Sequence, residues 1–293
     1  MSDFHMVVCV KAVPGSTEVK MDPKTNTIVR DGKQAVINPF DASALECALA
    51  LKDDFIGFGM DVRVTVVSMG IPATESLLCD CIARGADDAL LLTDRAFAGA
   101  DTLATSYALA QAIKKIGVPD IVLGGRQAID GDTAQVGPQV AQKLDLNQIT
   151  YVTSVDKVKD GKVVVTRHID GGIERVEAPM PILLTVNGNS APCRPRNAKL
   201  VMKYKRASAP KERPAEGLAY AEEYDKKPYL TIAQWSVADV DGDLNQCGLA
   251  GSPTKVKAVQ NIVFKAKESK RLTGADTDVE GLIKELLDSH TIG

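Results

Sequence analysis

The sequence predicts an α/β protein with a doubly wound, mostly parallel sheet, antiparallel β additions and a C-terminal arm. Three observations support this prediction. In the first half of the chain, short runs of β-branched residues alternate with stretches of helical periodicity, the pattern of parallel strands joined by helices. From Ile149 to Val186, strand-like runs are separated by turn sequences. Beyond Lys205 the chain becomes rich in Lys, Glu, Ala and Pro.

The elements of the parallel part follow one another closely. Strands are expected at residues 6–13, 62–68, 88–92 and 120–124, where short apolar runs rich in Val, Ile and Leu occur. Helices are expected at residues 42–54, 73–84, 102–116 and 133–144, where apolar residues recur three or four positions apart. Between the first strand and the first helix, residues 19–31 contain Asp22-Pro23 and Asp31-Gly32, which predict a small inserted hairpin.

The second half of the chain is expected to extend the sheet and then leave it. Turn signals at residues 159–162 and 170–172 flank alternating strands at 163–167 and 173–177. We therefore expect residues 1–205 to form one α/β domain. Residues 206–293 are expected to form an extended arm that ends in an amphipathic helix at 279–287. The arm has too little periodic apolar sequence for its own core, so it is expected to pack on another surface.

Composition excludes several classes of function. The 38 acidic and 35 basic residues leave no concentrated basic face, which argues against nucleic acid as a partner. The apolar runs are far shorter than the about 20 residues of a membrane span, and a strand follows the N-terminus too soon for a signal peptide, so a cytoplasmic location is expected. Six cysteines without a CxxC pair and only three histidines predict buried thiols, no metal site and no histidine-centred triad.

The most informative segment runs from Asp120 to Gly137, with the sequence DIVLGGRQAIDGDTAQVG. A buried strand passes through glycines into a polar loop and then a helix, and the unpaired amides at such a helix start can bind phosphate. Gly124, Gly125 and Gly131 would allow close approach of the backbone to a ligand. Thr133 could instead simply cap the helix. Asp130 and Asp132 are interpreted as turn and cap residues rather than metal ligands.

Two further segments start helices at the same predicted edge. Asp101, Thr102 and Thr105 open the helix at 102–116, where the hydroxyls share a face and Asp101 or Thr102 can act as a cap. Residues 38–41, Asn-Pro-Phe-Asp, open the first helix, with Asp41 as a possible cap. These loops follow or adjoin strands of one sheet, and open sheets bind ligands beyond the carboxyl ends of their strands. Neither a Walker A motif nor GxGxxG occurs, so any phosphate site is of another kind.

Four motifs together resemble the electron transfer flavoprotein beta family. They are Val8-Cys-Val-Lys-Ala-Val-Pro14, Asn38-Pro-Phe-Asp41, Gly125-Arg-Gln-Ala-Ile-Asp130 continuing to Gly137, and Ile169-Asp-Gly-Gly-Ile-Glu174. The resemblance implies a fold of the adenine-nucleotide alpha-hydrolase (Rossmann-like) type and a heterodimer with a larger, flavin-carrying alpha subunit. It implies a nucleotide site formed by Cys9, Asn38, Pro39, Phe40, Asp41, Met69, Gly125, Arg126, Gln127, Asp130, Gly131, Asp132, Thr133, Ala134, Gln135, Val136 and Gly137.

The family resemblance leaves two cofactors open. Conventional members hold AMP there, whereas flavin-bifurcating members hold a second FAD that takes hydride from NADH and divides the electrons between ferredoxin or flavodoxin and the alpha-subunit flavin. The run from Asp101 through Thr102 to Thr105 resembles the bifurcating type, in which hydroxyls contact the diphosphate, so FAD is favoured. No catalytic acid or base is assigned, because the redox chemistry belongs to the cofactor.

Two other expectations complete the sequence-based picture. The cluster Arg194, Arg196, Lys199, Lys203 and Lys205 resembles the loop by which this family docks on acyl-CoA dehydrogenase-type partners, although a solvated basic loop is the alternative. A nucleotide-hydrolysing enzyme on a similar sheet would need a phosphate loop such as Ser-Gly-Gly-x-Asp-Ser near the first strand. Val13-Pro-Gly-Ser-Thr17 does not match that motif.

Overall fold

The computed structural model describes residues 3–15, 21–22, 27–28, 35–188, 190–213, 221–255 and 269–292. By its internal contacts the chain divides into two units, Met1–Val256 and Lys257–Gly293. The boundary between them lies later along the chain than the one after Lys205 that composition suggests.

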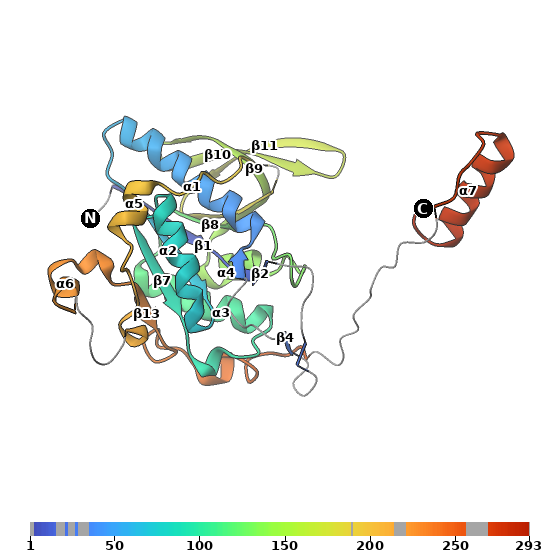
Figure 1. Cartoon of the computed structure of the whole chain (residues 1–293). Coiled ribbons are helices and arrows are strands. Elements are labelled where there is room, and N and C mark those ends of the chain that lie inside the picture. Colours follow the sequence, from blue (N-terminus) through green and yellow to red (C-terminus); the bar gives the residue numbers. More distant parts are fainter. Residues whose placement is uncertain are drawn as a thin grey trace. The chain divides into compact units, whose positions relative to one another are not determined.

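The first unit is built on one nine-stranded sheet (Figure 1). Its strand order is β11-β10-β9-β12-β8-β1-β6-β7-β13. The strands are β1 Phe4–Cys9, β6 Val62–Met69, β7 Asp88–Leu92, β8 Ile121–Gly125, β9 Asn147–Lys159, β10 Lys162–Ile169, β11 Gly172–Pro179, β12 Ile182–Val186 and β13 Ala233–Trp235. All neighbours from β9 to β13 in this order are parallel, and β10 is antiparallel to both β9 and β11. The predicted fold class is therefore confirmed.

Helices cover both faces of the parallel part, as doubly wound sheets require. The longer ones are α1 Pro39–Gly57, α2 Glu75–Arg84, α3 Thr102–Ile116 and α4 Val136–Leu144. Alternate residues of β1 separate the two cores: Met6 and Val8 pack with α1 and α2, whereas Val7 packs with α3 and α4. A strand buried on both faces reads as a continuous apolar run, which explains the sequence of β1.

Short elements complete the first unit. They are the helices α5 Ala198–Lys203 and α6 Ala221–Lys226, the 3-10 turns η1 Pro72–Thr74, η2 Arg95–Phe97, η3 Pro210–Glu212, η4 Pro228–Leu230 and η5 Leu244–Gln246, and the strands β2 Ala12–Pro14, β3 Met21–Asp22, β4 Thr27–Ile28 and β5 Ala35–Ile37. β3 pairs with β4 within the predicted hairpin, much of which lies outside the described residues. β2 pairs with β5, so the single strand expected at 6–13 is in fact two.

Most predicted helices and strands are present, and the differences lie at their ends. β7 and α3 have the predicted bounds. α1 begins at Pro39 rather than residue 42, because proline is favoured at the first helical position. α4 begins at Val136 rather than residue 133, because Asp132 and Ala134 both have φ near 53° and so cannot be helical.

The segment after Lys205 contributes to the sheet and to its core. β13 pairs with β7 and forms one edge of the sheet, and Ala209, Leu230 and Ile232 are buried in the core that contains α1 and α2. The sequence did not suggest this strand, because three residues are too few for a recognisable alternation.

The second unit contains the helix α7, Asp276–Asp288. It extends a little further than the predicted 279–287. Its apolar residues Val279, Leu282, Ile283 and Leu287 are 38–48% exposed, so the described residues of the second unit do not bury them. None of the helices in the described part of the chain has the length and apolar character needed to cross a membrane.

Candidate functional site

The loops after β1 and β8 meet at the carboxyl edge of the parallel sheet. Cys9 is in register with Gly124, and Gly125 with Val186 of β12, so three strands end together. Asn38, fully buried, holds the edge together: its side-chain amide donates to the Gln127 carbonyl at 2.8 Å and accepts from the Ile129 amide at 3.2 Å. The predicted convergence of the segments at 38–41 and 125–131 is thus observed.

Asp41 has a different role from the cap expected of it. Its carboxylate accepts from the Lys11 amide at 2.8 Å and from the Gly125 amide at 2.9 Å, and the helix α1 has no side-chain cap. Asp41 therefore connects the ends of β1 and β8. Burial raises the pKa of this carboxyl to about 7, against the lowering effect of hydrogen bonds from Asn38, Lys11 and Gly125.

The glycines at this edge differ in how closely other residues pack against them. A Cβ on Gly125 would lie 2.4 Å from Asp41 Oδ1 and 2.6 Å from Phe40, so glycine is required by the close approach of α1. This packing accounts for glycine at position 125, and the approach of a ligand to Gly125 stays a prediction. Around Gly131 nothing lies within 4 Å of such a Cβ, so that position is open.

Cys9 and Met69 lie at the ends of β1 and β6, half-buried and packed against the core shared by α3 and α4. Burial, with the neighbouring Asp41 carboxylate, raises the pKa of the Cys9 thiol to about 12. A raised pKa favours the protonated thiol over the nucleophilic thiolate at neutral pH.

The start of α4 is uncapped. Gln135 occupies the N-cap position without a side-chain hydrogen bond, so Thr133 is not the cap that the sequence suggested. Among the described residues, the backbone amides of residues 133–137 have no hydrogen-bond partner. Alternating left-handed conformations at Asp132 and Ala134 bend the loop just before this helix. Such a run of free amides at a helix start favours an anion.

The start of α3 is already capped by its own carboxylate. Asp101 accepts from the amides of Leu103 at 2.9 Å and Ala104 at 3.1 Å, which confirms the expected cap. The same carboxylate accepts from the backbone amide and hydroxyl of Thr254, at 3.1 and 2.8 Å. α3 thus offers a ligand fewer free amides than the sequence suggested.

The Thr102 hydroxyl joins the two helix starts. It donates to Gln135 Oε1 at 2.9 Å, across from α3 to the residue that precedes α4. The predicted segments 101–105 and 125–137 are consequently neighbours in the structure. Thr105, one turn further along α3, is half-buried.

Two residues of this edge were not predicted. Lys11 donates to Asp130 at 2.6 Å and ties the end of β1 to the loop; its position two residues after Cys9 could have suggested it. Tyr151, in β9, lies with its ring centroid 5.1 Å from the Arg126 guanidinium carbon. Nothing in the sequence marks Tyr151, because its place depends on how β9 is aligned with β12.

The basic cluster after Pro192 is partly neutralised within the chain. Arg194 forms ion pairs with Glu46 at 2.9 Å and Asp53 at 2.7 Å, both on α1. Arg196 pairs with Asp80 at 3.4 Å, and Lys203 lies 4.8 Å from the Tyr229 ring centroid. Arg194 and Arg196 therefore hold the loop against α1 and α2 through their ion pairs.

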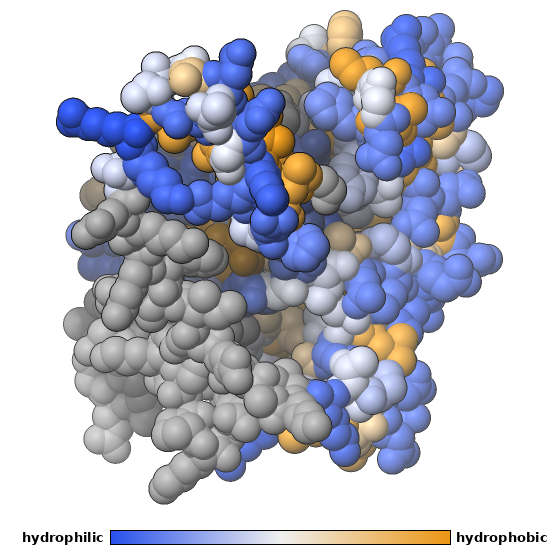
Figure 2. Space-filling view, turned by 90° about the vertical axis from the view of Figure 1, so that its right-hand side faces the viewer, coloured by the Kyte–Doolittle hydropathy of each residue, from blue (hydrophilic) through white to orange (hydrophobic). Residues whose placement is uncertain are grey.

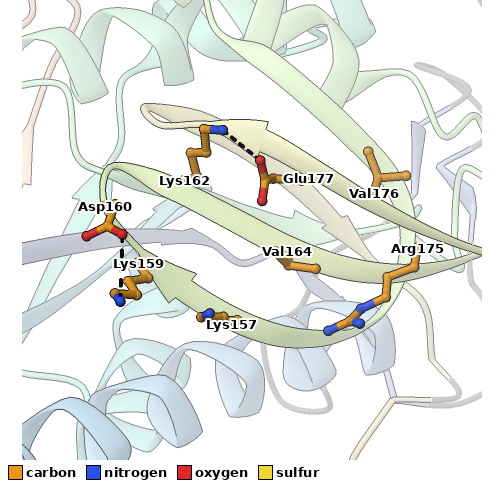
Figure 3. A pocket seen from close by; sticks show the side chains of 8 residues that line it. All are labelled: Lys157, Lys159, Asp160, Lys162, Val164, Arg175, Val176 and Glu177. Atoms are coloured by element: carbon orange, nitrogen blue, oxygen red, sulfur yellow. Dashed lines mark hydrogen bonds and ion pairs between the residues drawn. The ribbon is translucent and has the colours of Figure 1, made fainter.

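Two hollows elsewhere on the first unit are not lined by the free amides of residues 133–137. One of about 570 Å³ lies on the antiparallel strands β9 to β11, where Lys162 pairs with Glu177 and Lys159 with Asp160 (Figure 3). Another, of about 310 Å³, adjoins α3 and is lined by Leu103, Tyr107 and Lys143, among others. In Figure 2 the visible face is mostly hydrophilic, with small separate groups of apolar side chains. In the described ranges, no group of three His, Cys, Asp or Glu residues is placed to hold a metal ion.

The fold and this edge define a class: a Rossmann-like α/β protein with a candidate site where the parallel strands end. The electron transfer flavoprotein domain model matches residues 25–216. The chain belongs to the electron transfer flavoprotein family, and within it to the beta subunits.

Curated relatives agree with this membership. The chain is 43% identical over 253 residues to the caffeyl-CoA reductase-Etf complex subunit CarD of Acetobacterium woodii, covering 86% of each chain. It is 43% identical over 254 residues to the electron transfer flavoprotein subunit beta of Clostridium acetobutylicum, covering 87% of this chain and 86% of the relative. It is also 41% identical over 291 residues to protein FixA of Azorhizobium caulinodans, covering 97% and 94%.

Proposed function

We propose that this chain is the beta subunit of a flavin-bifurcating electron transfer flavoprotein and holds FAD at the carboxyl edge of its sheet. When bound, FAD would supply the chemistry of this role, which is the acceptance of hydride from NADH and the transfer of electrons to ferredoxin or flavodoxin and, through the alpha-subunit flavin, to an acyl-CoA dehydrogenase-type flavoenzyme. The observation that best supports the proposal is the Thr102–Gln135 hydrogen bond, which places the start of α3 beside the uncapped start of α4.

The residues at this edge fit a nucleotide with two phosphates. The free amides of residues 133–137 can receive one phosphate. The hydroxyls of Thr102 and Thr105 are donors for the second, since the amides of Leu103 and Ala104 are taken by Asp101. Under this proposal Thr102 turns its hydroxyl from Gln135 to the ligand.

The protein's own contribution is positioning. FAD, when bound, supplies the redox chemistry. Asn38 and Asp41 keep the loop after β8 in place through their hydrogen bonds to Gln127, Ile129 and Gly125, and the Lys11–Asp130 pair holds its far side. No side chain here is assigned as a general acid or base, because the redox chemistry would be that of the cofactor.

The second candidate is a conventional subunit that holds AMP as a structural component and passes electrons between a dehydrogenase and a quinone reductase. It is favoured by the cap at α3, because Asp101 leaves that helix start without free amides at Leu103 and Ala104. AMP needs only the donors of α4. The two candidates therefore differ in whether α3 contributes.

Cofactor analysis distinguishes the two candidates. The chain is co-expressed with its alpha subunit, the ligands are released by denaturation, and FAD and AMP are counted per heterodimer. Two FAD and no AMP would support bifurcation, whereas one FAD and one AMP would establish the conventional type.

A double variant tests the part assigned to α3. We expect Thr102→Val with Thr105→Val to lower FAD retention on the order of tenfold, because two hydroxyl donors to a charged group are lost. Thr102→Ser with Thr105→Ser is the matched control and should retain FAD. Unchanged flavin content in the valine variant, with an unchanged circular dichroism spectrum, would contradict the assignment.

Partner contacts are proposed for two other regions. The apolar stripe of α7, which the described residues of the second unit do not bury, is proposed to pack on the alpha subunit. The same is proposed for the other residues of the arm at 206–293 that lie beyond the first unit. Lys199, Lys203 and Lys205, which have no ion pair among the described residues, are proposed as the docking cations for the dehydrogenase. The cytoplasmic location stays a prediction.

A further inference from the structure

Arg126, directly after β8, lies between two aromatic rings. Its guanidinium carbon is 5.2 Å from the Phe40 ring centroid and 5.1 Å from that of Tyr151. Both distances are within the range of cation–π interactions. The backbone amide of Arg126 donates to the Val186 carbonyl at 2.9 Å, so the residue is fixed at its main chain as well as at its side chain.

The charge of Arg126 is not neutralised within the described chain. Lys11 and Arg194 each pair with a carboxylate, whereas Arg126 makes no ion pair and no side-chain hydrogen bond among the described residues. Its Nε atom is buried without an acceptor, while its two terminal nitrogens are not buried. Arg126 is half-buried, and its guanidinium is held by two rings while Nε lacks an acceptor, so an anion supplied from outside the chain can provide that acceptor.

Tyr151 reaches this position through an irregularity in β9. Leu184 and Val186 of β12 are aligned with Ile149 and Val152, so β9 has one more residue in this interval, which is a bulge. Tyr151 lies in it with φ of 60°, a conformation that bulky residues rarely adopt, and its amide donates to Thr185 Oγ1 at 3.3 Å. Bulges redirect side chains and are frequent beside binding sites, where strained backbone is retained.

Phe40 is held equally closely. A Cβ on Gly188 would lie 3.0 Å from Phe40 Cε1, and one on Gly125 would lie 2.6 Å from Phe40 Cβ. Two glycines thus leave the space that this ring fills. The rings of Phe40, from α1, and Tyr151, from β9, contact the Arg126 guanidinium at the start of the loop that joins β8 to α4.

We propose that Tyr151 and Phe40 are positioning residues that hold Arg126 to bind the phosphate of the nucleotide at this edge. The inference rests on the proposed nucleotide site and adds Tyr151 to it. The acceptor that Arg126 lacks is, under this proposal, a phosphate oxygen, and fixing the guanidinium in advance reduces the entropy lost on binding.

The test compares AMP with adenosine, which differ only in the phosphate, by calorimetric titration of nucleotide-free heterodimer. In Tyr151→Ser we expect AMP affinity to fall on the order of tenfold and adenosine affinity to remain unchanged. Tyr151→Phe keeps the ring and should behave as the wild type. Arg126→Gln should lose AMP affinity at least as strongly, and adding Tyr151→Ser to it should cause no further loss, because both act through one group.

Several outcomes would overturn the inference. Equal losses for AMP and adenosine in Tyr151→Ser would assign the ring a purely structural role, and additive losses in the double variant would separate it from Arg126. Loss of the heterodimer with AMP affinity retained would assign Arg126 to a partner's carboxylate. If the wild type binds adenosine as tightly as AMP, the Arg126 assignment alone fails; if it binds no AMP, ADP or FAD, the proposed function fails with it.

Discussion

Glu46 and Asp53 provide a matched pair of carboxylates, since both accept from the Arg194 guanidinium but differ in exposure. The Glu46 side chain is 12% exposed and the Asp53 side chain 61%. Glu46 also accepts from the Arg194 backbone amide at 2.8 Å and from Nε at 3.0 Å. Glu46→Gln keeps the volume but replaces one of these acceptors by an NH₂ group and removes the charge.

The expected costs follow from burial. Charge-assisted hydrogen bonds away from water contribute about 1.5–3 kcal/mol each, so we expect Glu46→Gln to lower the free energy of unfolding by about 2 kcal/mol. Asp53→Asn, at an exposed pair, should cost less than about 0.5 kcal/mol. Urea unfolding followed by the fluorescence of Trp235, the single tryptophan, measures both, with an unchanged slope as the control. Equal effects of the two substitutions would refute the reasoning that burial decides.

Two other predictions concern carboxylates at the candidate site. Burial raises the pKa of Asp41 from 3.8 to about 7, so between these pH values the folded state keeps a proton that the unfolded state loses. The contribution of Asp41 to the free energy of unfolding is therefore complete below about pH 4 and is lost as pH rises to about 7. Urea unfolding at several pH values gives the free energy of unfolding of wild type and of Asp41→Asn. Between about pH 5 and 7 the wild-type value should fall by roughly 2 kcal/mol relative to that of the variant. A difference that stays constant with pH would contradict this. Asp101→Ala, which removes the α3 cap and the Thr254 contacts, should lower the free energy of unfolding by about 1–2 kcal/mol, whereas Asp101→Asn should retain most of it; equal losses would argue against the cap.

The sequence predicted the architecture of the parallel part because its signals are local. Apolar periodicity located α3 and β7 to the residue, and the convergence of residues 38–41 with the loop after β8 followed from the general position of sites in open sheets. Element ends were less predictable. The late start of α4 depends on left-handed conformations at Asp132 and Ala134, which neither residue type requires.

Roles that depend on long-range packing could not be predicted. Asp41 has the residue type and position of a helix cap. Its carboxylate instead accepts hydrogen bonds from the backbone amides of Lys11 and Gly125, because β1 and β8 end beside it. Arg194 belongs to a basic run in the sequence, but α1 brings two carboxylates to it from about 140 residues away. Tyr151 requires knowledge of a one-residue bulge, which no local pattern of β9 indicates.

The bonds from Thr254 to Asp101 give the cap of α3 a second role. Thr254 lies two residues before the end of the first unit at Val256, so the carboxylate that closes the helix also fixes the point from which the chain continues toward the C-terminal unit. A substitution of Asp101 would therefore remove the hydrogen bonds of Thr254 together with the cap. The cap of α3 and the local position of Thr254 therefore depend on one carboxylate.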